Sequence, residues 1–432
     1  MNRKMSIISD FERHVSAGKV AFFKKNGMCF VMGKREHTLI ADIENGTEII
    51  NLHCNGGVFN LGHRNPQIIS TLKEALDHYD IGNHHFISTE RAKAAKMLSD
   101  LMPGDLTYTI FGVSGGEATD TAIKVARSFT KKQKIISVKG AYHGHTGLAL
   151  ATGDEKYRKP FGDDLPGFVQ CTFGDMKSLI SALDSDTAAV ILETIPATLG
   201  MPVPSAEYMK NLRQVCDENQ VLLILDEVQS GLGRTGKLWA FDHYDIIPDI
   251  VVLGKGLSGG IYPISATVLR KPLESVFHPD PFIHISTFGG AEPGCIVMQK
   301  VLEISSSPDF LDHVNRMAAV FKSAVDKLTQ KHGNFLTGLR QKGLMMGLVL
   351  KDEDCGPLLT KTAYDNGLLI IYANNDNRVC QLLPPLVMRE DEVPEIISRL
   401  DKALSQAREI MTELKGAKVD TGIRNSEKQQ SA

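Results

Sequence analysis

The chain has 432 residues, of which 42% are hydrophobic and 23% charged, and its formal net charge is −3. This length and composition predict a globular protein with one large and one smaller domain, or two to three units. The small net charge and the lack of a basic run argue against a nucleic-acid partner, and no apolar stretch is long enough to span a bilayer.

The seven cysteines are odd in number, and no two of them are spaced as CxxC. Neither a disulfide framework nor a zinc site is therefore indicated, and we expect no metal. Residues 1–10 contain no apolar core of signal-peptide length. These features favour a cytoplasmic protein.

Residues 1–55 are expected to form an N-terminal arm that belongs to the smaller domain. Glycines and the pair Asn45-Gly46 separate its short apolar pieces as turns. The predicted elements are a helix over 7–24 and strands over 28–32, 39–42 and 48–52.

Residues 56–305 are expected to form the large domain, because short apolar runs alternate there with segments of helical spacing. The continuous apolarity and β-branched content of these runs suit strands that are buried on both faces of a sheet. The alternation predicts an α/β domain with a mainly parallel sheet, whose functional groups gather at the carboxyl ends of the strands. The predicted strands are 108–113, 134–138, 188–193, 221–225, 250–253 and 264–269, and the predicted helices are 117–130, 176–183 and 206–219.

Residues 306–416 show a different, α+β pattern and are expected to form the C-terminal small domain. A helix is predicted over 311–332, strands over 343–350 and 367–371, and a last helix carries an apolar stripe. The polar tail 417–432 is expected to be disordered.

The first chemical signal is Ser114-Gly115-Gly116-Glu117, at the junction of a predicted strand and helix. Two glycines let the backbone approach a ligand closely, and the free N–H groups and dipole of a helix N-terminus favour a phosphate. A plain strand-to-helix turn explains the same residues equally well. The pattern is neither the dinucleotide motif GxGxxG nor a P-loop.

Three further residues follow predicted strands. Asp226 ends the apolar run 223–225 and could pair with a buried cation, although a helix cap or surface acid is the simpler explanation of a lone aspartate. Lys255 is flanked by glycines that leave room for imine chemistry, although most lysines are surface groups. Tyr142 could stack on a flat cofactor, although core packing explains a single aromatic ring.

The order of these motifs resembles the class III aminotransferases of fold type I. This group contains ornithine, acetylornithine and 4-aminobutyrate aminotransferases and glutamate-1-semialdehyde aminomutase. The similarity covers most of the chain, from about Asn51 to Leu386, and the block from Asp226 to Lys255 is highly specific to the family. The matching stretches are 114–118 (SGGEA), 141–145 (AYHGH), 225–236 (LDEVQSGLGRTG), 248–256 (PDIVVLGKG) and 286–290 (STFGG).

The resemblance implies a large α/β domain with a mainly parallel sheet flanked by helices, and a smaller α+β domain built from the N-terminal segment and the C-terminal part. It also implies the cofactor pyridoxal 5′-phosphate (PLP), held by Lys255 as a Schiff base, with Asp226 bonded to the pyridinium nitrogen. Thr287 would bind the phosphate of the neighbouring subunit's cofactor, in a homodimer with shared active sites. The other implied positions are Gly115 and Gly116 at the phosphate, Tyr142 and Val228 on the ring, His143 close by, Glu193 near ring and substrate, and Gln229 at the phenolic oxygen.

The implied activity is transamination between a small amine or amino acid and an aldehyde or 2-oxo acid, with ping-pong kinetics. Lys255 would serve both as imine partner and as acid and base, a task that an always-protonated arginine could not perform. The alternative is a PLP-dependent racemase or epimerase, aminomutase or decarboxylase on the same fold, because these reactions begin at the same Schiff base.

Positions that would recognise the substrate depart from many members of the family. Gln381 stands where an arginine grips a substrate carboxylate, Thr198 where a glutamate masks that arginine, and His145 where some members have another arginine. One hypothesis is a substrate without a conventionally bound α-carboxylate, such as an ω-amine, an amino sugar or a biosynthetic aldehyde. The other is that Arg378 or Arg158 binds the carboxylate from a different position.

Overall fold

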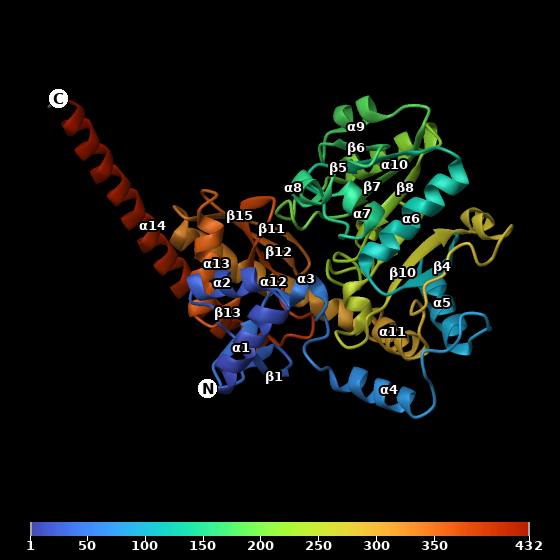
Figure 1. The fold of residues 1–432 in the computed structure, drawn as a ribbon, viewed down its shortest axis with the longest axis horizontal. Helices are drawn as coiled ribbons and strands as arrows, with labels where there is room; N and C mark the ends of the chain where they lie inside the picture. Colours follow the sequence, from blue (N-terminus) through green and yellow to red (C-terminus); the bar gives the residue numbers. More distant parts are fainter. Residues whose placement is uncertain (1, 431–432) are drawn as a thin grey trace.

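The computed structural model describes the backbone of residues 2–430 and the side chains of residues 2–414. A seven-stranded sheet forms the centre of the part drawn in green and yellow (Figure 1). All of its strands run in one direction except β10, which is antiparallel to both neighbours, so the predicted α/β fold with a mainly parallel sheet is confirmed. The strand order is β4 (Leu106–Gly112), β10 (Ser265–Arg270), β9 (Ile250–Leu253), β8 (Leu222–Asp226), β7 (Thr187–Glu193), β5 (Lys134–Val138) and β6 (Phe168–Cys171).

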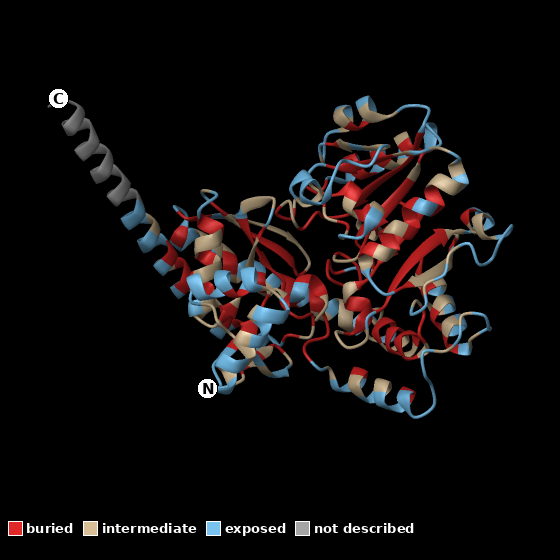
Figure 2. Cartoon of the chain, viewed as in Figure 1, coloured by how far each residue is buried: buried red, intermediate tan, exposed pale blue. Residues whose placement is uncertain are grey.

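Alternate residues of these strands enter two different hydrophobic cores. In β8, Leu223 and Leu225 join one core and Ile224 joins the other. Successive strand residues point to opposite faces, so a sheet covered on both sides needs apolar residues at every position. Figure 2 accordingly shows these strands as buried throughout much of their length. The helices of this part are α4 (Pro66–Leu76), α5 (Thr89–Leu101), α6 (Gly115–Thr130), α7 (Gly147–Thr152), α8 (Glu155–Arg158), α9 (Met176–Ala182), α10 (Ala206–Glu218) and α11 (Glu292–Ser305).

A further core lies among the C-terminal elements and includes Leu52 from near the start of the chain. Strand β3 (Glu48–Asn51) pairs in parallel with β13 (Leu368–Leu369), which builds the N-terminal segment into this part, as expected. Figure 1 shows the blue helices α1 and α2 beside the orange C-terminal elements. The remaining elements are α1 (Arg3–His14), α2 (Ala17–Lys25), β1 (Met32–Glu36), β2 (Leu39–Asp42), α3 (Cys54–Gly57), α12 (Pro308–His332), β11 (Leu336–Lys342), β12 (Met345–Leu350), α13 (Cys355–Asp365), β14 (Ile371–Ala373), β15 (Asp376–Leu382) and α14 (Val393–Gln430).

The structure differs from the sequence pattern in several elements. The helix predicted over 7–24 is interrupted, because Ser16 begins α2 by accepting a hydrogen bond from the backbone N–H of Lys19. Strands β11 and β15 carry several polar residues and therefore lack the apolar run by which a strand is predicted. The predicted disorder of 417–432 lies outside the residues whose side chains are described. Within the described residues, no helix has the length and apolar character needed to cross a membrane.

Candidate active site

A cavity of about 360 Å³ lies at the carboxyl edge of the seven-stranded sheet. Loops that follow parallel strands meet at this edge, so residues far apart in the sequence come together there. Most residues indicated by the sequence line it, and the exceptions are Thr287, Thr198, Arg158, Arg378 and Gln381. The lining residues are Ser114, Gly115, Gly116, Tyr142, His143, Gly144, His145, Thr146, Glu193, Asp226, Val228, Gln229 and Lys255.

Asp226, the last residue of β8, is buried and contacts His143. The His143 Nδ1 lies 2.8 Å from Asp226 Oδ2, and the other carboxylate oxygen accepts the backbone N–H of Val228 at 2.9 Å. Burial alone would lower the pKa of His143, but the hydrogen bond to Asp226 and the charge of its carboxylate raise that pKa above its ordinary value. The imidazole therefore fixes the orientation of the carboxylate within the cavity.

Glu193 ends β7 and is the register partner of Asp226 in the neighbouring strand. Its carboxyl oxygens accept the backbone N–H groups of Tyr142 and Ala197, each at 3.2 Å. Burial raises the pKa of Glu193 to about 7; the charge of His143 opposes this rise and that of Asp226 adds to it. The cavity thus contains a carboxyl group that can exchange a proton near neutral pH.

Lys255 follows β9 and begins a single 3-10 turn, Lys255–Ser258, with a left-handed φ of 44°. Such a conformation is unfavourable for lysine and is characteristic of functional sites. The Nζ atom donates a hydrogen bond of 2.8 Å to Gln229 Oε1. Burial lowers the pKa of this amine, although the charges of Asp226 and Glu193 oppose the effect. A larger fraction of this amine is therefore unprotonated near neutral pH than in an exposed lysine, and only the unprotonated amine can accept a proton.

The start of α6 presents a backbone cradle to the cavity. The Ser114 side chain caps the helix by accepting the N–H of Glu117. A Cβ on Gly116 would lie 2.8 Å from Thr146 Oγ1, and a Cβ on Gly144 would lie 2.6 Å from Gly116 Cα. Glycine is thus required where these two loops touch, and the exposed N–H groups of the helix start can bind a phosphate.

The other five residues indicated by the sequence lie elsewhere, and one of them, Arg158, is paired with Asp164. Thr287 is exposed on the surface. The Thr198 hydroxyl donates to a backbone carbonyl 3.0 Å away. Gln381 is buried in β15 between β12 and β14. Arg378 forms an ion pair with Asp376, with Nε 2.9 Å from Oδ1. None of these side chains lines the cavity within this single chain.

Sequence reasoning missed two residues of the site. Thr146 contributes a hydroxyl next to the glycines of α6. Gly56, in the turn α3, lies so close to the Lys255 side chain that a Cβ on it would be 3.2 Å from Nζ. The sequence Asn55-Gly56-Gly57 indicates a turn, but no local signal shows that this turn meets a lysine far along the chain.

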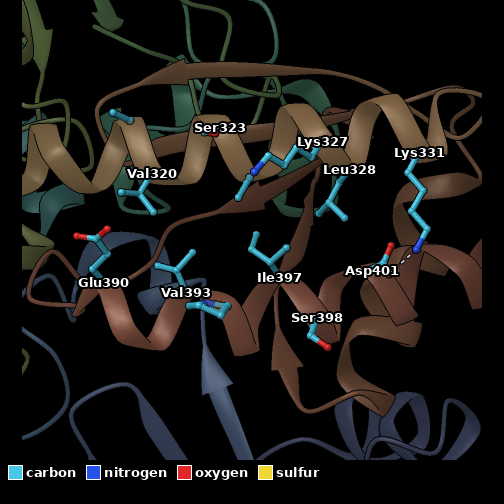
Figure 3. Close-up of a pocket in the computed structure, with 13 residues that line it drawn as sticks. Val320, Ser323, Lys327, Leu328, Lys331, Glu390, Val393, Ile397, Ser398 and Asp401 are labelled. Carbon is cyan, nitrogen blue, oxygen red and sulfur yellow. Dashed lines mark hydrogen bonds and ion pairs between the residues drawn. The ribbon is translucent and has the colours of Figure 1, made fainter.

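A larger hollow of about 840 Å³ lies between α12 and α14 (Figure 3). Its walls include Val320, Val393 and Ile397, and at one end Lys331 Nζ lies 2.6 Å from Asp401 Oδ2. It contains no residue that the sequence indicated, so it is not the candidate catalytic site. Within the described part of the chain, no three His, Cys, Asp or Glu side chains are grouped to hold a metal ion.

The groups that line the cavity match those needed to bind PLP. The α6 start suits a phosphate, the Asp226 carboxylate suits a protonated ring nitrogen, and the Lys255 amine suits an aldehyde. Among the described residues, Gln229 Nε2 and His143 Nε2 are buried without a hydrogen-bond partner. Buried polar atoms are normally paired, so an unpaired amide N–H beside Lys255 is consistent with a ligand oxygen at that position.

Comparisons with known proteins agree with this chemistry. A family model described as Aminotransferase class-III matches residues 22–404. An uncharacterized aminotransferase of Archaeoglobus fulgidus is 52% identical over 411 residues, covering 94% of this chain and 96% of that protein. An acetylornithine aminotransferase of Caldanaerobacter subterraneus is 36% identical over 382 residues, covering 87% and 94%. The crystal structure of ornithine aminotransferase from Toxoplasma gondii matches with a TM-score of 0.86 at 27% identity, covering 95% and 96%.

Proposed function

Because the chain belongs to the class-III aminotransferases, it is a PLP-dependent transaminase, and we propose that the cavity around Lys255 is its active site. The observation that carries this proposal is the meeting of Lys255, Asp226 and Glu193 beside the glycine-rich start of α6. The relatives compared are named aminotransferases, and none supports the racemase, aminomutase or decarboxylase alternative.

Lys255 has two tasks in this proposal. Its Nζ would hold the aldehyde group of the cofactor, and the free amine would accept and return a proton at the substrate carbon. The lowered pKa of the buried amine supports the second task, because a protonated amine cannot accept a proton. When bound, PLP supplies the electron sink that stabilises negative charge on the substrate carbon.

Asp226 and Gln229 orient the cofactor ring. The Asp226 carboxylate would accept a hydrogen bond from the protonated ring nitrogen, and His143 holds that carboxylate in place through its Nδ1. Gln229 uses Oε1 for the Lys255 amine, which leaves its Nε2 to donate to the phenolic oxygen. Tyr142 and Val228 line the cavity as the two surfaces between which a flat ring would lie.

The phosphate site is completed in a homodimer with shared active sites. Gly115 and Gly116 provide backbone N–H groups from α6, and Thr287 provides its hydroxyl to the cofactor of a second copy. The surface near Thr287 supports this arrangement, because Ile285 and Phe288 are exposed on it. Exposed apolar side chains in a contiguous segment are characteristic of a protein interface.

The substrate of this proposal lacks an arginine-bound α-carboxylate and is an ω-amine, an amino sugar or a biosynthetic aldehyde. Within the described residues, no arginine lines the cavity. Arg378 is paired with Asp376, and Arg158 is paired with Asp164 and donates to a backbone carbonyl. The side chain of His145 lies instead at the cavity, beside the Tyr142 ring at a centroid distance of 5.0 Å.

We also propose that residues 56–305 form a large domain and that residues 1–55 and 306–416 together form a small domain. It is supported by the separate hydrophobic cores of the two parts. A cytoplasmic location is proposed as well, because all seven cysteines are free, as is usual in a reducing compartment.

The test is an absorbance titration of the purified protein with PLP. We expect a visible band that Lys255→Ala lacks and that the exposed-lysine control Lys271→Ala retains. Borohydride treatment should fix the cofactor on the peptide that contains Lys255, as read by mass spectrometry. Equal spectra for wild type and Lys255→Ala, with no labelled peptide, would overturn the assignment.

The substrate is then identified with a panel of amines: glutamate, alanine, ornithine, 4-aminobutyrate and an amino sugar. We expect an amine without an α-carboxylate to convert the band to that of the aminated cofactor at lower concentration than glutamate does. Conversion by glutamate at the lowest concentration of the panel would reject the proposed substrate class and leave the transaminase assignment intact.

A further inference from the structure

The turn α3 (Cys54–Gly57) has an uncommon backbone conformation. Its four residues all have positive φ: 51° for Cys54, 51° for Asn55, 67° for Gly56 and 99° for Gly57. Left-handed conformations are unfavourable for residues with a side chain, so a run of four needs support from its surroundings. Asn51 gives that support, because its Oδ1 accepts the backbone N–H of Cys54 at 2.9 Å.

This turn lies directly against the Lys255 side chain. A Cβ on Gly56 would lie 3.2 Å from Lys255 Nζ, 3.3 Å from Lys255 Cε and 3.3 Å from Gln229 Oε1. All three distances are shorter than ordinary van der Waals contacts of a Cβ. The amine can therefore lie between the turn and Gln229 because residue 56 has no side chain.

A transaminase needs such a position for its lysine. The amine is displaced when the substrate takes its place, and it must then stay close enough to move a proton. We propose that Gly56 and Gln229 Oε1 form the resting place of the free Lys255 amine during this part of the cycle, which makes Gly56 a positioning residue. The proposal rests on the assignment of Lys255 as the lysine that holds PLP.

The surroundings of the amine suit this role. Nζ donates to Gln229 Oε1 at 2.8 Å, so one of its hydrogens has a partner in the resting place. His53 precedes the turn, and burial lowers its pKa to about 4, with the charge of Lys255 adding to the effect. The imidazole is neutral at physiological pH and does not repel the amine.

Variants at two adjacent glycines distinguish the effect of a side chain against Lys255 from the effect of a side chain on the left-handed backbone of the turn. Gly56→Asn adds a Cβ in a conformation that asparagine tolerates and that Asn55 already adopts in the same turn. Gly56→Ala adds the Cβ alone. The matched control is Gly57→Ala. Gly57 also has a positive φ, but a Cβ on it would face Asn60 Oδ1 at 3.3 Å and the Gln229 backbone oxygen at 3.7 Å.

The first measurement is the rate at which formaldehyde and cyanoborohydride methylate Lys255 in the cofactor-free full-length protein, followed by mass spectrometry of the peptide. A Cβ at residue 56 displaces Nζ into the open cavity, so we expect about fivefold faster methylation in Gly56→Asn and Gly56→Ala. Gly57→Ala should stay within about twofold of wild type. Equal rates for the variants at 56 and at 57 would overturn the proposal.

The second measurement is the half-reaction of the PLP-loaded enzyme with an amino donor. We expect its limiting rate to fall about tenfold in Gly56→Asn, with less than a twofold change in the donor concentration at half-saturation. A change in half-saturation alone would also overturn the proposal. The methylation assay needs no cofactor, so it still locates the amine if the spectra show that Lys255 does not hold PLP.

Discussion

Glu227, the residue after Asp226, is buried and has no cationic partner among the described side chains, and this has a measurable consequence for stability. Its carboxyl accepts the Thr194 hydroxyl at 2.5 Å and the Ala240 backbone N–H at 2.8 Å. Burial raises the pKa of Glu227 to about 7, and these hydrogen bonds offset only part of the effect. Glu227→Gln removes the ionisable group and keeps the shape of the side chain.

The pH dependence follows from linkage. A carboxyl whose pKa is raised on folding binds more protons in the folded state than in the unfolded state between pH 4.5 and 7. The wild-type free energy of unfolding therefore decreases across this window and levels off above it. A shift from 4.5 to about 7 corresponds to about 3 kcal/mol at 25 °C. The glutamine should accept Ala240 N–H and donate to Thr194, so its own contribution is independent of pH.

Urea unfolding of the cofactor-free protein at pH 5, 6, 7 and 8 measures this difference. We expect Glu227→Gln to gain about 2.5 kcal/mol relative to wild type as the pH rises from 5 to 8, since part of the full difference lies below pH 5. The control is Glu207→Gln on the exposed surface of α10, for which no such gain is expected. A difference between Glu227→Gln and wild type that stays constant from pH 5 to pH 8 would refute the reasoning.

Three further outcomes are expected. A double-mutant cycle with His143→Leu and Asp226→Asn should give a coupling of about 1.5–3 kcal/mol in the free energy of unfolding at pH 6. Because the folded pKa of His143 is raised, this coupling should fade as pH rises through that pKa, and equal values at pH 6 and 9 would contradict the pairing. Arg234 is fully buried and donates hydrogen bonds to the backbone oxygens of Leu344 and Pro384 and to Asn60 Oδ1. Arg234→Met should therefore lower the free energy of unfolding by about 3 kcal/mol. A loss below about 1 kcal/mol in urea unfolding would contradict this. Ile87 is fully exposed and lines the same surface hollow as Ile285, next to Thr287. Ile87→Glu should therefore shift the protein towards monomer in sedimentation velocity, and an unchanged distribution would locate the interface elsewhere.

The central sheet was predictable because its signals are local. Strands β7, β8 and β9 are apolar at consecutive positions, and each is followed by a polar residue or glycine at the edge where loops gather. The carboxyl-edge rule for parallel sheets then brings Asp226 and Lys255 together without any knowledge of tertiary contacts, whereas Glu193 was indicated only by the resemblance to the family. The same reasoning applies to the glycines at the start of α6.

Residues that depend on contacts between distant segments were not predictable in this way. The β3–β13 pairing joins two short strands separated by most of the chain, and neither sequence indicates which strand it pairs with. The contact of Gly56 with Lys255 is of the same kind. For Gln381, the family pattern suggests a contact with the substrate that the single chain does not show. Its backbone is paired on both sides, with β12 and β14, and its side chain does not line the cavity.

The two carboxyl groups at the edge of β7 and β8 have different surroundings, and this difference bears on the substrate. Asp226 faces the His143 imidazole, whereas Glu193 receives only backbone N–H groups, and burial raises its pKa to about 7. When their surroundings give two neighbouring carboxyl groups different pKa values, one commonly acts as the acid and the other as the base. Glu193 becomes negative above pH 7 in a cavity that no arginine of the described residues lines, so carboxylate-bearing donors should lose affinity above pH 7 while donors without a carboxylate should not. Spectral titrations with 4-aminobutyrate and a simple alkylamine at pH 6.5 and 8.5 test this, and parallel changes for both donors would show that the Glu193 carboxyl does not face the substrate.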